Sequence, residues 1–383
     1  MGAGLIGTSI ALALRARDAD VLLTDRDPAN LRLATDLGAG RSLEGAEPGL
    51  APAGEPRPWS GDAPGPASAG GRAEPGAEPV ADLVVIAVPP AAVAATLRDA
   101  QARRLGRVYT DAASVKSAPL AAARTLGCDL GSYVPGHPMG GSERSGPAAA
   151  RADLFLGRPW ALCPAPETAE SAVEAVTELA RACGAEPVRL SPADHDRAVA
   201  LVSHGPHVTS AAVAARLAAG DPAALRLSGQ GVRDVTRIAA GDPRLWTGIL
   251  RHNAGPVADV LDAVAHDLTE AAAALRKLGA GDDASADTMT GLLRRGNTGR
   301  DRIPGKHGGP SRAYAVVPVV IPDEPGALAR LFAAAETAGV NIEDVRLDHS
   351  PGLPVGVAQL SVRPQEAERL SAALAEKGWS VHG

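Results

Sequence analysis

Three glycines near the start of the chain, Gly2, Gly4 and Gly7, constrain the fold more than any other feature of the sequence. Their G-x-G-x-x-G spacing opens an apolar segment that predicts a helix through Leu14. The first glycine of such a pattern permits a tight turn, the second lets the backbone approach a pyrophosphate, and the third lets the helix pack closely on a strand. The pattern therefore predicts a doubly wound α/β domain that binds a dinucleotide at a helix N-terminus.

An acidic residue after the next apolar stretch indicates which dinucleotide is bound. Residues 21–24 predict a short strand, and Asp25 follows it directly. A carboxylate at this position accepts hydrogen bonds from ribose hydroxyls and repels a 2′-phosphate, so NAD is expected. Arg26 leaves NADP open, because an arginine beside this position can stabilise that phosphate. The residues expected to bind the cofactor are Gly2, Gly4, Leu5, Ile6, Gly7, Asp25, Val88 and Pro89.

The first domain is expected to span residues 1–190. The fingerprint normally follows a strand, but only Met1 precedes it here, so the first strand of the sheet is expected to be missing. The unbroken apolar run at 83–88 predicts a strand buried on both faces. Further strands are expected at 108–110, 133–134, 160–163 and 186–190.

A segment within this domain has a different composition. Residues 41–79 are rich in Pro, Gly, Ala and Glu and have few large apolar side chains. Such a segment cannot bury enough surface to offset its ordering entropy. We expect a disordered surface insertion with no catalytic role.

The rest of the chain predicts three further parts. Residues 191–290 are expected to form an all-helical domain, since Ala and Leu recur there at spacings of three and four. Residues 291–312 are basic and Gly-rich, which predicts an irregular linker. Residues 313–383 carry the order β-α-β-β-α-β, the ferredoxin-like motif.

Charge and composition exclude several classes of partner. The net charge of -6 argues against nucleic acid or an anionic membrane. No apolar run approaches the roughly 20 residues that span a bilayer, and no secretion signal is evident, so the cytoplasm is expected. Three widely spaced cysteines favour neither a disulfide framework nor a zinc site.

Two polar stretches follow predicted strands at the carboxyl edge of the sheet, where open α/β sheets bind ligands. Residues 111–116 read D-A-A-S-V-K, and residues 136–143 read G-H-P-M-G-G-S-E. His137, between Gly and Pro, is expected in a short rigid turn. A neutral imidazole there can accept a proton from a substrate hydroxyl, and Ser114 can orient the imidazole or the substrate. A purely structural histidine is the alternative interpretation.

The helical region carries a second group of candidates. His204 and His207 lie one turn apart, but no Cys or carboxylate cluster completes a metal site, so no metal is expected. Asp234 and Arg237 share one helix face, and an arginine there can hold a substrate carboxylate by two parallel hydrogen bonds. A surface ion pair is the alternative. Trp246 is expected to wall the pocket or to pack between helices.

These motifs together resemble the prephenate dehydrogenase (TyrA) family. The G-x-G-L-I-G, D-x-x-S-x-K, G-H-P-M-x-G, S-H-x-P-H and D-x-T-R-I-A…P-x-x-W stretches occur in the family's order over residues 1–290, apart from the segment 41–79. The resemblance implies a Rossmann domain followed by a helical domain that forms a homodimer. It also implies NAD-dependent oxidative decarboxylation of prephenate to 4-hydroxyphenylpyruvate, in tyrosine biosynthesis.

The resemblance assigns roles to individual residues. His137 accepts the proton of the ring hydroxyl, and Ser114 supports His137 or contacts the same hydroxyl. The substrate-binding residues implied are Arg237, which holds the ring carboxylate, His207, Asp234, Lys116 and Trp246.

The C-terminal part resembles an ACT domain, a module that often binds amino acids. The D-x-P-G-x-L stretch at 323–328, followed by N-I at 341–342, carries the resemblance. Amides at the helix start can receive an amino-acid carboxylate. Feedback inhibition by L-tyrosine follows by analogy. The residues expected to hold the effector are Asp323, Gly326, Ala327, Leu328, Asn341 and Ile342.

Two other functions remain open. Arogenate dehydrogenase performs the same chemistry on a substrate with an amine in place of the side-chain keto group. A non-catalytic amino-acid sensor, in which only the tail functions, fits less well, because the fingerprint, Asp25, His137 and Arg237 are all present.

Overall fold

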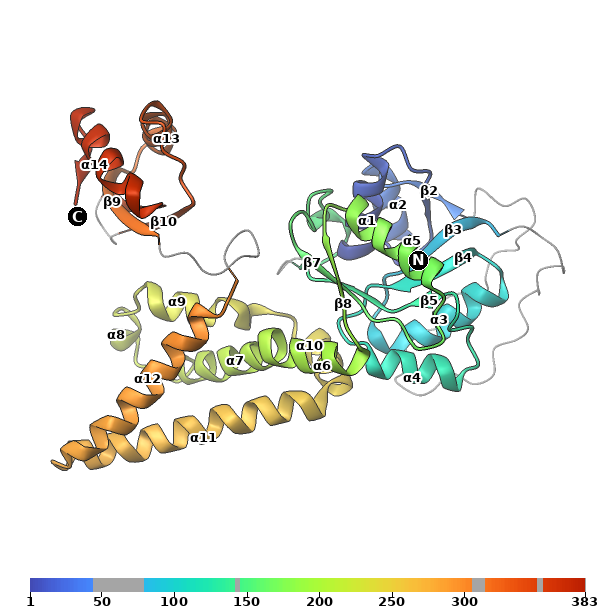
Figure 1. Cartoon of the computed structure of the whole chain (residues 1–383), viewed down its shortest axis with the longest axis horizontal. Helices are drawn as coiled ribbons and strands as arrows, with labels where there is room; N and C mark the ends of the chain where they lie inside the picture. The colour runs from blue at the N-terminus through green and yellow to red at the C-terminus, as the bar shows by residue number, and fades with distance from the viewer. Residues whose placement is uncertain (44–78, 142–144, 305–313, 350–353, 383) are drawn as a thin grey trace. The chain divides into compact units, whose positions relative to one another are not determined.

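The computed structural model describes residues 1–43, 79–141, 145–304, 314–349 and 354–382, and it divides into two compact units, 1–268 and 269–383 (Figure 1). The insertion expected at 41–79 lies mostly outside the described residues. Its start was placed too early: Arg41–Ser42 is strand β2, and Leu43 is buried in the core. Two strand residues and one buried leucine are too short a signal to stand out beside a Pro- and Gly-rich segment.

A parallel sheet forms the centre of the first unit (Figure 1). It contains β3 (Ala81–Ile86), β4 (Gly106–Asp111) and β5 (Tyr133–Val134). Val84 of β3 packs with α3 and α4 on one face, whereas Val85 packs with α1 and α5 on the other. Burial on both faces explains the unbroken apolar run, and the predicted doubly wound α/β domain is confirmed. These helices are α1 (Leu5–Arg15), α3 (Pro90–Ala102), α4 (Ser117–Thr125) and α5 (Glu170–Ala182), and α2 is Pro28–Asp36.

The described strands do not connect the β3 edge of this sheet to β1 (Leu22–Leu23) by hydrogen bonds. Among the described strands, β1 pairs only with β2, in a separate parallel pair. The first two residues bridge the sheets, because the Met1 amino group donates to the Val85 carbonyl and the Gly2 amide donates to the Thr24 carbonyl, each over 2.8 Å. A cavity of about 670 Å³ lies between β1 and β3, lined mainly by apolar side chains.

A second, smaller sheet carries His137. β6 (Gly136–Pro138) runs antiparallel to β7 (Pro159–Leu162), which runs parallel to β8 (Glu186–Arg189). His137 pairs with Ala161 of β7. The rigid turn expected around His137 is therefore wrong, because a strand of three residues is defined by its distant partner and not by local pattern.

Residues 191–268 are helical, as predicted. Asp221 and Asp242 cap helices through hydrogen bonds to backbone amides, and each is followed by a proline in the first turn. Among the helices of the described ranges, none is long and apolar enough to cross a membrane. The elements are α6 (Pro192–Val199), the π-helix η3 (Ala200–His204), α7 (Gly205–Leu217), α8 (Pro222–Leu225), α9 (Gln230–Thr236), η4 (Arg237–Ala240), α10 (Pro243–His252) and α11 (Ala254–Gly279), which continues into the second unit.

The second unit contains α12 (Ala286–Asp301) and a four-stranded antiparallel sheet of order β10-β11-β9-β12. Residues 291–301, expected to be an irregular linker, are helical. Asp287 in the first turn and Arg300 in the last suit the helix dipole. Both tail helices pack on one face of the sheet. The remaining elements are β9 (Ala315–Pro322), α13 (Ala327–Thr337), β10 (Asp344–His349), β11 (Val355–Val362), α14 (Ala367–Glu376) and β12 (Ser380–Val381).

Candidate active site

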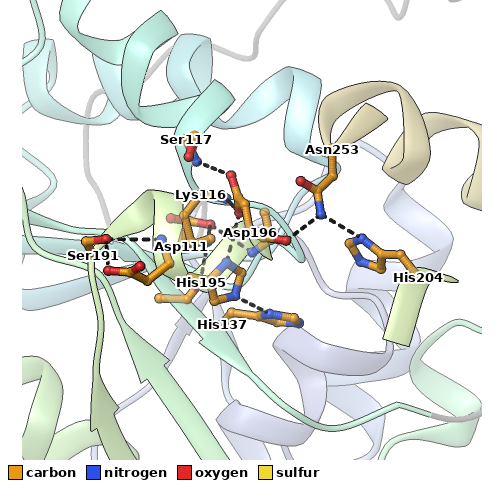
Figure 2. A network of polar contacts seen from close by, with 12 residues as sticks. Asp111, Lys116, Ser117, His137, Ser191, His195, Asp196, His204 and Asn253 are labelled. Atoms are coloured by element: carbon orange, nitrogen blue, oxygen red, sulfur yellow. Dashed lines mark hydrogen bonds and ion pairs between the residues drawn. The ribbon is translucent and has the colours of Figure 1, made fainter. Parts of the chain in front are cut away.

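His137 hydrogen-bonds a second histidine, which in turn contacts a carboxylate (Figure 2). Nδ1 of His137 is 2.9 Å from Nε2 of His195, and the two rings meet edge to face. Nδ1 of His195 is 2.9 Å from Oδ1 of Asp196. The three side chains form a continuous chain from half-buried His137 to the buried Asp196.

Backbone amides hold the carboxylate at the end of this chain. The Lys116 amide donates to Oδ1 of Asp196 over 2.8 Å, and the Ser117 amide donates to Oδ2 over 2.9 Å. Burial alone would raise the pKa of Asp196, but the hydrogen bonds from His195, Ser117 and Lys116 lower it to about 2. Asp196 is therefore an ionised, firmly placed acceptor at neutral pH.

His137 itself is neutral at neutral pH. Burial lowers its pKa well below 6.5, and the neighbouring His195, Lys116 and His204 lower it further against the opposing charge of Asp196. A neutral imidazole can accept a proton, which suits the role expected for His137.

Lys116 supports this site from the protein interior. Its side chain is completely buried and donates to the Asp111 carboxylate and to the Gly136 carbonyl. The Tyr133 hydroxyl donates to the other oxygen of Asp111 over 2.6 Å, and burial raises the pKa of that phenol well above 10. Lys116 thus fixes the strand before His137. The expected substrate contact by Lys116 is wrong for this structure, because the side chain is enclosed.

His195 and Asp196 were not singled out from the sequence. Both lie in the middle of α6, which Ser191 caps by accepting from the Asp194 amide over 3.0 Å. The available signal was three polar residues in a row, D-H-D at 194–196, at the start of an otherwise apolar helical region. Ser114, the expected partner of His137, is half-buried in the loop before α4, and its role stays a prediction.

A wall of aromatic rings lies next to this chain. His207 stacks on Trp246 with ring centroids 3.5 Å apart, and His204 meets the same indole edge to face at 6.0 Å. Burial lowers the pKa of His207, and burial with the nearby His195 lowers that of His204 to about 4. Asn253 joins His204 to the carbonyl of Asp196. Within the described ranges, no group of three or more His, Cys, Asp or Glu side chains could hold a metal ion.

Asp234 and Arg237 lie on an exposed segment that leads to this wall. Arg237 begins η4, and Oδ1 of Asp234 accepts from the side-chain amide of Gln230 over 2.8 Å. η4 ends at Gly241, where an added Cβ would lie 2.4 Å from Nε1 of Trp246. Arg237 is therefore an exposed cation within one short turn of the aromatic wall.

The glycine turn has the shape that a dinucleotide needs. Gly2 has φ +95°, and an added Cβ would lie 2.3 Å from a carbonyl beyond β3. A Cβ on Gly7 would lie 1.9 Å from the Gly2 carbonyl, whereas nothing lies within 4 Å of one on Gly4. The start of α1 is thus open at Gly4, where its unpaired amides can receive a phosphate. Asp25 stands beside this turn and accepts from the Ala3 amide over 2.5 Å.

The other residues expected at the cofactor flank the same turn. Leu5 and Ile6 begin α1 and are half-buried. Val88 packs against the core, and Pro89 precedes α3. The structure brings these residues to one end of the sheet, and their contact with a cofactor stays a prediction.

The expected effector residues lie at two opposite ends of the sheet in the second unit. Four of them are at the start of α13, beyond the Pro322 end of β9: Asp323, Gly326, Ala327 and Leu328. Asn341 and Ile342 follow the other end of α13 and precede Asp344, which pairs with Ser361 opposite Val316 at the start of β9, so the sequence-based expectation of one effector site within a single chain is wrong. Gly326 caps this helix with φ +84°, a conformation that favours glycine. Leu328 and Ile342 pack against the core, and Ala327 is buried. Asp323 and Asn341 are exposed, and Asn341 donates to Glu343 over 3.0 Å.

Comparison with known proteins gives a consistent result. Residues 75–189 match the family model of the prephenate dehydrogenase nucleotide-binding domain, and residues 191–292 match that of the prephenate dehydrogenase dimerization domain. The probable prephenate dehydrogenase NovF of Streptomyces niveus is 38% identical over 387 residues, which cover 100% of this chain and 98% of that protein.

Solved structures share the fold. Prephenate dehydrogenase from Aquifex aeolicus, in complex with hydroxyphenyl propionate and NAD+, aligns with a TM-score of 0.60 at 22% identity, over 78% of this chain and 96% of that one. Synechocystis arogenate dehydrogenase aligns with a TM-score of 0.58 at 23% identity, over 79% and 97%. Given the extent and identity of the match to NovF and the two adjoining domain matches, the chain belongs to the prephenate dehydrogenase family.

Proposed function

We propose that this protein is an NAD-dependent prephenate dehydrogenase, which converts prephenate to 4-hydroxyphenylpyruvate and CO2 in L-tyrosine biosynthesis. The observation that carries the proposal is the neutral imidazole of His137, which is half-buried and hydrogen-bonded to His195. This imidazole occurs in a protein of the prephenate dehydrogenase family. A neutral imidazole placed in this way can act as a general base.

The reaction needs one base and a dry site. When bound, NAD supplies the acceptor for the hydride that leaves the ring carbon bearing the hydroxyl. His137 accepts the hydroxyl proton as the carbonyl forms. The bond from the ring to its carboxylate then breaks and CO2 leaves. The electron pair of that bond moves through the ring to the carbonyl oxygen, which takes back a proton from His137, so that the aromatic ring carries a hydroxyl. Because aromaticity drives the last step, the protein need only start the oxidation and exclude water.

The remaining predicted residues divide between substrate and cofactor. Arg237 holds the ring carboxylate, since its planar guanidinium can make two parallel hydrogen bonds. The stack of His207 on Trp246 forms the wall of the ring pocket. Ser114 contacts the same hydroxyl as His137. The turn at Gly4 receives the pyrophosphate, and Asp25 receives the ribose.

An absorbance assay at 340 nm tests the function directly. The purified protein is mixed with prephenate or arogenate, each with NAD or NADP. We expect fastest NADH formation from prephenate with NAD. Faster turnover of arogenate would assign the alternative substrate, and no reduced cofactor in any of the four mixtures would leave only an amino-acid sensor.

We also propose that the helical domain forms a homodimer. Apolar side chains on its helices are exposed in the single chain, including Leu201 and Val202, each 64% exposed, and Leu245. Exposed apolar surface of this kind is expected where another copy binds. Light scattering should give twice the mass of the 38.6 kDa chain. A single-chain mass at micromolar concentration would contradict the proposal.

We propose further that residues 313–383 are a ferredoxin-like ACT domain that mediates inhibition by L-tyrosine. The strand order β10-β11-β9-β12 and the helix start at Gly326 support this assignment. An effector acts by favouring one state of the enzyme, typically with a coupling of about 1–3 kcal/mol. Because α12 ends at Asp301, truncation belongs after Arg302 and not inside the helix.

The truncated enzyme should keep its turnover and lose its sensitivity to tyrosine. The comparison is of initial rates at several tyrosine concentrations, with the full chain beside it. Equal inhibition of both proteins would place tyrosine in the catalytic pocket, because tyrosine resembles the product.

A further inference from the structure

We infer that His195 and Asp196 act as positioning residues that fix the tautomer of His137, so that Nδ1 carries a proton and Nε2 is free to accept one. The inference rests on the proposed function, in which His137 is the base. It deepens that function by naming the groups that make His137 a base at a defined atom.

The argument starts at the carboxylate. Asp196 accepts from the backbone amides of Lys116 and Ser117, so both of its oxygens are held in place. An ionised carboxylate can only accept hydrogen bonds. Since Nδ1 of His195 lies 2.9 Å from Oδ1 of Asp196, this ring nitrogen must carry the proton.

The second ring follows from the first. A neutral imidazole protonated on Nδ1 has a lone pair on Nε2. Nε2 of His195 therefore accepts from Nδ1 of His137, over 2.9 Å. His137 is then protonated on Nδ1, and its Nε2 carries the lone pair that a substrate hydroxyl needs.

The surroundings keep this arrangement neutral and rigid. The Lys116 ammonium is buried beside β6, which disfavours a further positive charge nearby before substrate binds. Asn253 holds the backbone of Asp196 through its carbonyl over 2.8 Å. Once His137 has taken the substrate proton, its Nδ1–H remains bonded to His195, and the negative charge of Asp196 stabilises the new cation through that ring.

The energetic consequence is large. When a catalytic histidine is held in the wrong tautomer, as after loss of the carboxylate charge in the serine protease triad, turnover falls by roughly 10⁴-fold. Loss of the His195 acceptor leaves His137 free to adopt either tautomer, so a smaller loss is expected here.

Nitrogen NMR tests the tautomer without any assay of activity. Protein labelled with ¹⁵N in its histidines is recorded at pH 7.5, and the His137 signals are assigned from their absence in His137→Asn. We expect the proton of His137 on Nδ1. A proton on Nε2 would overturn the inference, even if the protein oxidises prephenate.

Kinetics provide the second test. His195→Leu removes the acceptor and should lower kcat by about 10²–10³-fold, with KM for prephenate and NAD changed by less than about threefold. His137→Asn combined with His195→Leu should be no slower than His137→Asn alone, because the two residues act as one unit. His195→Gln should retain more activity than His195→Leu, since its amide oxygen can accept from Nδ1.

The control is His252→Leu, which removes a half-buried histidine bonded to its own helix through the Gly248 carbonyl. It should leave kcat unchanged. A His195→Leu enzyme with normal kcat, equal losses in His195→Gln and His195→Leu, or a further loss in the double variant would overturn the inference. If His195→Leu does not fold, His195→Gln and the NMR spectrum of the wild type still decide.

Discussion

The two units of this chain bury different kinds of residue. Among the described residues, the first unit buries a set of polar side chains that includes Asp111, Lys116, His195 and Asp196. The second unit buries one, Glu343, and its core is otherwise made of aliphatic residues on β9, β11 and the two tail helices. Buried polar groups cost free energy unless they are paired, so a protein that keeps many of them uses them for something other than stability alone.

The polar groups of the first unit serve two different ends. Lys116 and Asp111 form a closed ion pair that fixes the backbone before His137. Asp196 and His195 form a chain that ends on the half-buried imidazole of His137. The buried charges of Lys116, Asp111 and Asp196 thus hold the site in place. The group that performs the chemistry, His137, lies at the less buried end of the polar network.

The largest expected effect is on the stability of the first unit. Lys116→Met leaves the Asp111 charge buried without its partner, which typically costs about 3–5 kcal/mol. The midpoint of thermal unfolding should fall by roughly 10 °C. Arg124→Met is the matched control, because it breaks an ion pair with Glu167 that is about half exposed on both sides. That change should cost less than about 1 kcal/mol. Equal losses in both variants would erase the distinction between buried and exposed pairs.

A smaller effect is expected at the surface of the same unit. Arg237→Ala should raise KM for prephenate by about 10–100-fold, since a charged hydrogen bond contributes roughly 1.5–3 kcal/mol. Arg237→Lys should restore only part of the affinity, because a point charge cannot replace the planar guanidinium. Arg233→Ala serves as the control. Full rescue by lysine, or a larger effect of Arg233→Ala, would show that Arg237 is not the residue that holds the ring carboxylate.

The smallest expected effect is the loss of stability of the first unit at acid pH. His137 and His204 are neutral when folded and have lowered pKa values, that of His204 being about 4. The unfolded chain therefore binds more protons below pH 6.5, and the stability of the first unit falls as the pH falls from 6.5 toward 4. Each histidine should lower the free energy of unfolding by about 1–2 kcal/mol between pH 7 and pH 5.

Tryptophan fluorescence of a Trp379→Phe variant would report this change, since the other three tryptophans belong to residues 1–268. A midpoint of urea unfolding that is equal at pH 7 and pH 5 would contradict it. Because a histidine that is buried in neutral form lowers the stability of the folded protein on acidification, the midpoint of unfolding must fall.

Local patterns in the sequence predicted the main features of the first unit. The glycine turn, the buried run of β3 and the helical region after residue 190 each follow from periodicity or from one motif. His137 was found because it stands between Gly136 and Pro138, in a short motif that follows a predicted strand. These features are local, and local sequence is enough to define them.

The features that sequence missed depend on distant partners. Strand β6 exists because His137 pairs with Ala161, and Asp196 is significant because the amides of Lys116 and Ser117 reach it across the fold. Lys116 was expected at the substrate because the family resemblance implied it, yet the direction of its side chain depends on the placement of Gly136. Such contacts between residues far apart in the chain cannot be read from spacing.

The central claim is that His137 is the base of an oxidation of prephenate. Its most direct test is the kcat of His137→Asn with saturating prephenate and NAD, followed at 340 nm beside the wild type. We predict a loss of about 10²–10⁴-fold with nearly unchanged affinity for NAD, because asparagine keeps much of the shape but cannot accept the proton. Turnover close to that of the wild type would contradict the account.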